Sequence, residues 1–209
     1  MIDKMSIGAF TSDHTTIARN KTKFILPFKG EWFVFWGGKS LKDNYHNARQ
    51  NMFGAFDFWV LGPNGKSHKE NHSTNEDFYA FGQEIIAPAD GKIIWVSDKI
   101  KDNVWPNINR DIPYGNALII ETKDKDYITL AHLKEKSLQV KMGQEVKQGD
   151  LLALCGNSGH STEPHLHFQL QKSPDLISSP GALSHFARIK VDGEIRTDYS
   201  PKKGQKISN

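Results

Sequence analysis

No segment of this chain sustains the apolar period of about 3.6 residues that marks an amphipathic helix. Short runs rich in aromatic and β-branched residues alternate instead with polar turns, a pattern typical of strands. We expect strands over residues 24–28, 31–36, 55–61, 84–88, 91–97, 117–122, 127–133 and 165–171, with shorter apolar pieces between 140 and 156. The polar turn KDKD predicts a hairpin between two of these strands. The sequence therefore predicts an all-β fold.

The chain is interpreted as one domain with extensions, because its 209 residues are enough to bury a sizeable core. We assign residues 1–23 to an N-terminal arm, 24–192 to the single domain and 193–209 to a flexible polar tail. Two long polar insertions, 61–77 and 98–113, interrupt the strands. Loops of this length often form functional rims or lids.

Composition excludes few functions. The formal charge is +3, and no Lys/Arg cluster is interleaved with aromatics, which argues against a nucleic-acid partner. No apolar run approaches the roughly 18 residues of a membrane span. The first residues lack a basic segment followed by an apolar one, so location and export route stay open, as does the oligomeric state. The single cysteine, Cys155, lies in an apolar run and is expected to be a buried thiol rather than a nucleophile.

Two histidines stand one residue apart in the apolar run PHLHFQL. Residues i and i+2 of a strand point to the same face, so His165 and His167 would lie side by side. His132 ends another predicted strand, YITLAH, and Asp57 lies between two phenylalanines. A buried carboxylate there needs a cation or several donors, because burying a bare charge is costly. Taken alone, His132, Asp57 and His46 each also fit a structural role.

Together these side chains fit a zinc site. Catalytic zinc takes three protein ligands from histidine and carboxylate and keeps one position for water, which then loses a proton near neutral pH. A hydrolase also needs a group that moves the proton and groups that stabilise the oxyanion. A strand with two histidines serves both needs when one binds metal and the other stays unligated. His160, in the loop before that strand, is the candidate for substrate contact.

The segment from Tyr114 to Gln169 resembles the lysostaphin-type zinc metallopeptidases, which cleave peptidoglycan peptides. The matching pieces are YGNALIIE, TLAHL, VKMGQEVKQGDLLALCGNSG and PHLHF, in the family's order, with IIAPADGKIIWV upstream. The resemblance covers residues 45–171. It implies a compact antiparallel β-sandwich of curled strands, with long loop insertions as groove walls. It also implies a zinc endopeptidase of the cell envelope or exterior, acting on a peptidoglycan peptide or another peptide.

The resemblance further implies that the zinc ligands are His46, Asp57 and His167. It also implies two unligated catalytic histidines, His132 and His165. One catalytic histidine would take the proton from water, and the other would stabilise the oxyanion. The family usually spaces its first two ligands as His-x-x-x-Asp, whereas ten residues separate them here. An insertion must therefore loop out and return, and His68 or His72 are the alternative ligands.

Two other interpretations stay open. The chain could be a catalytically silent scaffold or activator of the same fold, which would hold no stoichiometric zinc. It could also be a biotinyl- or lipoyl-like carrier, since APADGKI and VKMGQEVKQGDLLALCG resemble the turns and strands of such barrels. The carrier interpretation leaves the histidines unexplained and finds no lysine at a hairpin tip in an attachment motif. The sequence does not identify the bond that is cleaved.

Overall fold

The computed structural model describes residues 18–209, so most of the expected N-terminal arm lies outside the described residues. Within that range the regular structure consists of antiparallel strands and three short 3-10 helices, η1 (Tyr45–Ala48), η2 (Gln50–Met52) and η3 (Asn75–Asp77). The all-β prediction is confirmed. The described residues contain no helix that is long and apolar enough to cross a membrane.

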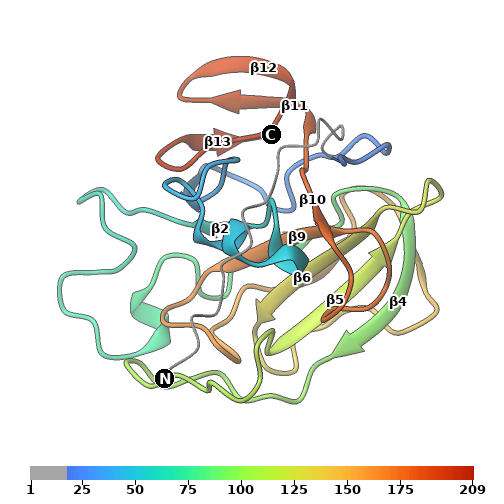
Figure 1. The fold of residues 1–209 in the computed structure, drawn as a ribbon. Coiled ribbons are helices and arrows are strands. Elements are labelled where there is room, and N and C mark those ends of the chain that lie inside the picture. Colours follow the sequence, from blue (N-terminus) through green and yellow to red (C-terminus); the bar gives the residue numbers. More distant parts are fainter. Residues whose placement is uncertain (1–17) are drawn as a thin grey trace, which may run out of the picture.

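In the described part of the chain, eleven strands form one large twisted sheet, in the order β12-β11-β13-β1-β2-β9-β6-β5-β4-β7, with β10 paired to β9 (Figure 1). Their bounds are β1 (Trp32–Trp36), β2 (Phe56–Trp59), β4 (Gly91–Ser97), β5 (Asn116–Glu121), β6 (Tyr127–Leu133), β7 (Glu145–Val146), β9 (Leu166–Gln171), β10 (Gly181–Ala182), β11 (Phe186–Val191), β12 (Glu194–Tyr199) and β13 (Lys206–Ser208). A second, two-stranded sheet pairs β3 (Glu84–Ile86) with β8 (Leu151–Leu154). The predicted hairpin is confirmed as β5–β6.

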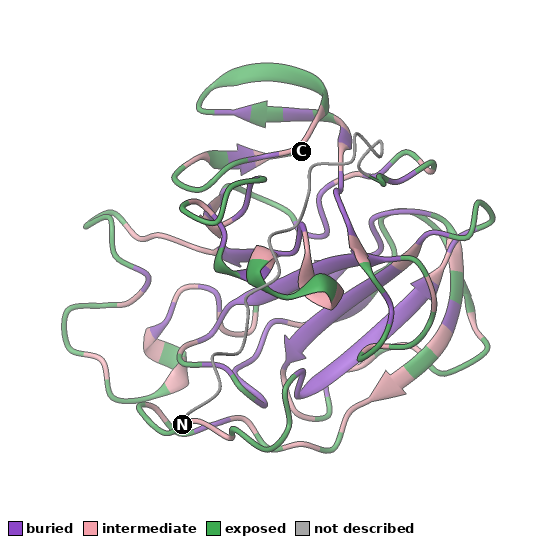
Figure 2. Ribbon diagram, in the orientation of Figure 1, coloured by how far each residue is buried: buried purple, intermediate pink, exposed green. Residues whose placement is uncertain are grey.

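Alternation along β2 and β9 separates the core from the opposite face of the sheet. Phe56 and Phe58 are buried in the main apolar cluster, and Asp57 between them points the other way. The register pairs Phe56 with Phe168 and Asp57 with His167, so the polar residues of both strands share one face. The central strands β5, β6 and β9 are the most continuously buried part of the sheet (Figure 2). The polar pair Asp57 and His167 therefore lies on, or next to, the most buried strands of the sheet.

Residues 24–28 do not form the predicted strand. Only Phe24 and Phe28 make bridges, to Phe186 and Ile85 respectively. Pro27 lacks an N–H and interrupts ladder pairing. The segment still packs into the core, where Phe24, Leu26 and Phe28 are fully buried. The aromatic content was therefore a correct indicator of burial but not of regular strand structure.

Residues 193–209, predicted to be a flexible tail, form two ordered strands instead. Strand β13 pairs with both β1 and β11, and Ile207 is buried in the core. The Asn209 side chain adds hydrogen bonds to the backbone of Leu26 and Phe28. The prediction is wrong because the polar composition of this segment reflects mainly strand β12, which is exposed (Figure 2). The end of the segment is fixed by the buried side chain of Ile207 and by the side-chain amide of Asn209.

Cys155 is fully buried in the same core. Burial raises the pKa of its thiol, with a smaller contribution from the Asp102 carboxylate. A thiol in this state is not an activated nucleophile.

Candidate metal centre

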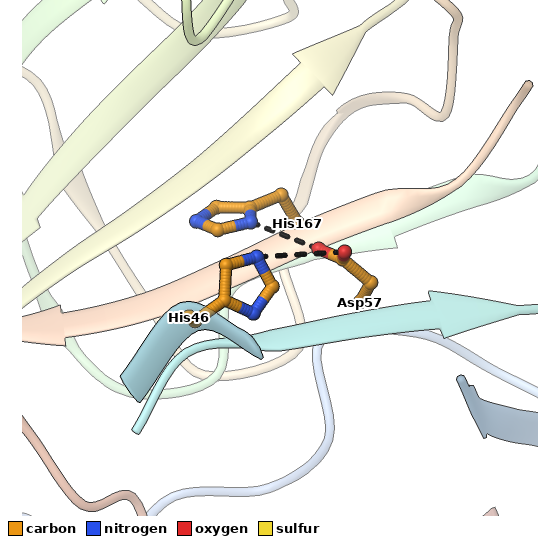
Figure 3. A group of neighbouring side chains, drawn as sticks. All are labelled: His46, Asp57 and His167. Atoms are coloured by element: carbon orange, nitrogen blue, oxygen red, sulfur yellow. Dashed lines mark hydrogen bonds and ion pairs between the residues drawn. The ribbon is translucent and has the colours of Figure 1, made fainter. Parts of the chain in front are cut away.

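Three of the predicted site residues converge on one point (Figure 3). His46, Asp57 and His167 each offer a ligand atom, and these atoms lie within 4.8 Å of one another. Asp57 and His167 come from adjacent positions of the paired strands β2 and β9, and His46 comes from helix η1. All three are buried. The structure thus brings together the set of metal ligands expected from the sequence.

The insertion between His46 and Asp57 folds into η1 and η2 and returns to β2. Asn44 anchors its beginning, since the amide nitrogen of this side chain donates to the carbonyl of Ala55 at 2.8 Å. The Asn47 side chain accepts from the backbone N–H of Gly54 at 2.9 Å, where a φ of +75° turns the chain back. These contacts explain how the unusual spacing still delivers His46 to the same point as Asp57.

One nitrogen of His46 is buried without a partner. Nδ1 lies 2.8 Å from the side-chain oxygen of Asn44, to which it can donate. Nε2 lies 3.5 Å from Asp57 Oδ2 and makes no hydrogen bond to any of the described residues. A buried polar atom without a partner is costly, and a metal ion would satisfy this lone pair. The arrangement therefore fits a bound cation.

His167 has partners on both ring nitrogens. Nδ1 lies 2.9 Å from Asp57 Oδ1, and Nε2 lies 3.3 Å from the side-chain oxygen of Gln169. Gln169 in turn donates to Gln171 at 3.0 Å, and this pair is fully buried. If Nε2 donates to Gln169, Nδ1 keeps its lone pair for a metal, and partners of this kind orient metal-binding histidines. The sequence interpretation did not include Asn44 or Gln169, although the alternation of His165, His167, Gln169 and Gln171 on one strand face was visible.

The two histidines predicted to stay unligated lie beside this group. The ring centroids of His132 and His165 are 4.7 Å apart, and His165 Nε2 lies 3.6 Å from Asp57 Oδ1. His165 Nδ1 faces the carbonyl of Glu163, and His132 Nδ1 faces the carbonyl of Ser158, each at 2.8 Å. Because a carbonyl only accepts, both Nδ1 atoms carry the hydrogen and both Nε2 atoms keep their lone pairs when the rings are neutral.

Burial and neighbouring charges shift the pKa values of these groups in different directions. Burial lowers the pKa of His46 to about 4 and that of His132 well below its ordinary value. Burial also opposes charge on His165, but the Asp57 carboxylate together with the carbonyl and carboxylate of Glu163 raises the pKa of that ring. For Asp57, burial is countered by the surrounding histidines, which hold its pKa well below the ordinary value. The carboxylate is therefore ionised and available to a cation.

A cavity of about 450 Å³ lies over the group. Besides Asp57, His132, His165 and His167, its lining includes an aromatic wall of Phe35, Trp36, Tyr45 and Trp59. His160 is exposed and also lines this cavity, so its place is compatible with the predicted substrate contact. The stacked rings of Phe35 and Trp59, with centroids 3.6 Å apart, also line a second cavity of about 430 Å³.

The first long insertion contributes Leu61 and residues 65–68 to the lining of this second cavity. The other insertion reaches the first cavity through Pro113. His68 and His72 pack against each other with tilted rings, whose centroids are 3.7 Å apart. Neither belongs to the group of converging ligand atoms found among residues 18–209. The structure therefore favours His46 over these two as the third ligand.

Comparison with known proteins identifies the family. The model of Peptidase family M23 matches residues 71–179. An uncharacterized metalloprotease of Buchnera aphidicola is 39% identical over 101 residues, covering 48% of this chain and 26% of that protein. Peptidoglycan DD-endopeptidase ShyB of Vibrio cholerae is 34% identical over 100 residues, covering 47% of this chain and 20% of its own. Murein hydrolase activator NlpD of Escherichia coli is 33% identical over 90 residues, covering 43% and 20%.

The match to this chain thus covers 20% of the length of ShyB, 20% of NlpD and 26% of the Buchnera protein. Among solved structures, a zinc containing peptidase from Vibrio cholerae aligns with 71% of this chain and 37% of its own, at 22% identity and a TM-score of 0.45. The family match includes His132, His165 and His167 and extends over more than half of the sequence. The chain therefore belongs to peptidase family M23.

Proposed function

We propose that this chain is a zinc-dependent endopeptidase that hydrolyses peptide bonds in peptidoglycan cross-links or stem peptides. Membership of the family supports a role as a peptidoglycan hydrolase or as an activator of one. The observation that carries the finer proposal is the convergence of His46, Asp57 and His167 around a buried histidine nitrogen that has no partner among residues 18–209.

The donor set supports zinc as the metal. Two imidazoles and one carboxylate are a ligand combination of catalytic zinc, which leaves a position open for water or substrate. When bound, zinc would supply a Lewis acid and lower the pKa of a coordinated water to about 7. Asn44 and Gln169 would orient the two histidine ligands through the ring nitrogens that face away from the metal.

His132 and His165 are proposed to do the proton chemistry. Both present an Nε2 lone pair to the cavity, because their Nδ1 atoms are bonded to backbone carbonyls. One of them accepts the proton of the attacking water, and the other, once protonated, stabilises the oxyanion. The proton then passes to the leaving amine. His160, on the rim of the cavity, is proposed to contact the substrate.

Peptidoglycan peptides are the proposed substrate, and the cell envelope or exterior is the proposed location. The relative ShyB is named as a peptidoglycan DD-endopeptidase, and this chain is 34% identical to it over 100 residues. An aromatic wall beside the metal ligands suits a peptide, whose backbone and side chains can pack on flat rings.

The alternative is a catalytically silent activator, and similarity to NlpD, named as a murein hydrolase activator, favours it. The two functions differ in their need for metal. The retention of a complete set of converging ligands supports the enzyme over the activator.

The test is metal analysis of the purified chain, combined with digestion of peptidoglycans of several cross-bridge types and mass analysis of the fragments. We expect one zinc per chain and chelator-sensitive cleavage. His167→Ala should lose zinc and cleavage, whereas His165→Ala should keep zinc and lose cleavage by about 10²–10⁴-fold. His68→Ala is the matched control and should retain both. A chain without stoichiometric zinc would support the activator, and full zinc in His167→Ala would refute the ligand assignment.

A further inference from the structure

One positive side chain lies among the residues that line the cavity over the metal ligands. Within the described residues, that lining contains Arg49 but no other arginine or lysine, and Asp57 is its single carboxylate. Arg49 belongs to the insertion between His46 and Asp57 and connects η1 to η2. The segment that positions the proposed ligand His46 therefore also places a guanidinium in the lining of the cavity over the metal ligands.

The backbone of Arg49 is fixed on both sides. Its N–H donates to the carbonyl of His46 at 2.9 Å, and its own carbonyl accepts from the N–H of Met52 at 3.1 Å. The side chain therefore leaves the main chain at a defined point, one short turn after a proposed ligand. The Arg49 side chain lines the cavity, so its guanidinium can reach a group that binds beside the metal.

The guanidinium is available to a ligand. No carboxylate of the described residues lies within 4.0 Å of it, whereas Arg19 and Arg196 each form an ion pair. Its charge also acts on another residue of the lining. Burial raises the pKa of Tyr114, and the hydrogen bonds of Gln169 and Asn51, followed by the charge of Arg49, oppose this rise.

The charge balance of the cavity favours an anion. A divalent cation on Asp57 and two neutral histidines would leave a net positive charge, and Arg49 adds to it. Clefts lined by one sign of charge concentrate ligands of the opposite sign. A planar guanidinium also matches a carboxylate with two parallel hydrogen bonds, which makes arginine selective for this group.

We propose that Arg49 binds a free carboxylate of the peptide, so that this site selects substrates with a carboxylate close to the bond being cleaved. The carboxylate is either the C-terminus of the peptide or an acidic side chain next to the scissile bond. The selection of substrates for cleavage rests on the proposed function. The binding of a carboxylate by Arg49 does not, and it is tested separately.

The experiment uses one synthetic pentapeptide in four forms, with the C-terminus and its single acidic side chain each present as the acid or the amide. Binding is measured by titration calorimetry to the zinc-loaded full chain carrying His165→Ala, which keeps the peptide intact. Cleavage of the same four forms by the chain with His165 in place is followed by mass spectrometry. We expect one acid form to bind about tenfold more tightly than its amide, as one charge-assisted hydrogen-bonded contact provides.

Arg49→Gln should remove this preference without changing the zinc content, and Arg49→Lys should keep part of it. Arg188→Gln, at an exposed position of β11, is the control and should keep the full preference. Equal binding of all four forms, no binding of any form, or an unchanged preference in Arg49→Gln would each overturn the inference. Discrimination in binding without any cleavage would instead sink the proposed function and leave the role of Arg49 intact.

Discussion

Asp57 and His167 face each other across strands β2 and β9, with Asp57 Oδ1 2.9 Å from His167 Nδ1. Their proximity follows from strand register, which is fixed by the phenylalanines on the opposite face. A slip of one residue would turn one of the pair into the core and is therefore strongly disfavoured. Two of the three proposed ligands are thus held in place by the fold itself, and the third depends on a turn.

Gln169 is expected to tune metal affinity through His167. Replacing it with methionine removes the acceptor for His167 Nε2 and should weaken zinc binding by about 10–100-fold. Gln169→Glu keeps an acceptor and should bind zinc nearly as well as the unchanged chain. Competition with a chromophoric chelator gives both affinities. Equal affinities of the methionine and glutamate variants would contradict an orienting role for this side chain.

His132 is expected to act on the proton and not on the metal. His132→Gln should keep one zinc per chain and lower kcat by about 10²–10⁴-fold, because the variant cannot exchange a proton with water. His160→Ala, on the exposed rim, should change KM more than kcat. The measurements are zinc content and steady-state kinetics on a cleaved peptide. Loss of zinc from His132→Gln would make His132 a ligand.

The metal-free chain should lose stability as the pH falls from about 6.5 towards 4. Burial lowers the pKa of His46 to about 4, while the ordinary value is 6.5. Below pH 6.5 this ring therefore binds a proton in the unfolded chain but stays neutral in the folded chain. This difference in proton binding favours unfolding. Between pH 7 and pH 5 this ring should account for about 2 kcal/mol of lost stability.

Urea unfolding of the chelator-treated chain at these two pH values measures the effect. His46→Asn should show a smaller loss than the unchanged chain, and His160→Asn, at an exposed position, should not differ from it. An identical pH dependence in His46→Asn would contradict a buried neutral ring at this position.

Zinc itself should stabilise the fold. Free zinc at about a thousand times its dissociation constant adds about 4 kcal/mol, which corresponds to a rise in Tm of about 10 °C for a chain of this size. Thermal unfolding with and without chelator measures the shift. His167→Ala should unfold at the same temperature in both conditions, and a shift in that variant equal to that of the unchanged chain would place the metal elsewhere.

Local pattern was enough to predict the strands that carry the site. β4 and β6 match their predicted ranges, because alternating apolar residues and the hairpin turn define them locally. The position of Asp57 and the histidine pair on one sheet face follows from the same alternation. The strands after residue 171 were not predicted, because their pairing depends on distant contacts, as in β13, where Ile207 pairs with Trp32 of β1. The absence of a strand at residues 24–28 was also missed, although Pro27 is a local signal against ladder pairing.

The convergence of His46 with Asp57 could be predicted only from the family resemblance. Nothing local in the sequence says that ten intervening residues will return to the same point, because the return depends on the contact between Asn44 and Ala55. The orienting roles of Asn44 and Gln169 were missed for a similar reason. Amide side chains can form hydrogen bonds in many environments, and their partners are known only from the fold.

The position of β13 between β1 and β11 has a consequence for how the molecule opens. Three strands, β11, β13 and β1, separate the edge strand β12 from the strand that carries Asp57. Fraying begins at edges, where backbone hydrogen bonds meet water, so transient opening at β12 leaves the ligand strands closed. The alternating charges of Glu194, Arg196 and Asp198 on that strand also discourage another chain from adding to the sheet there.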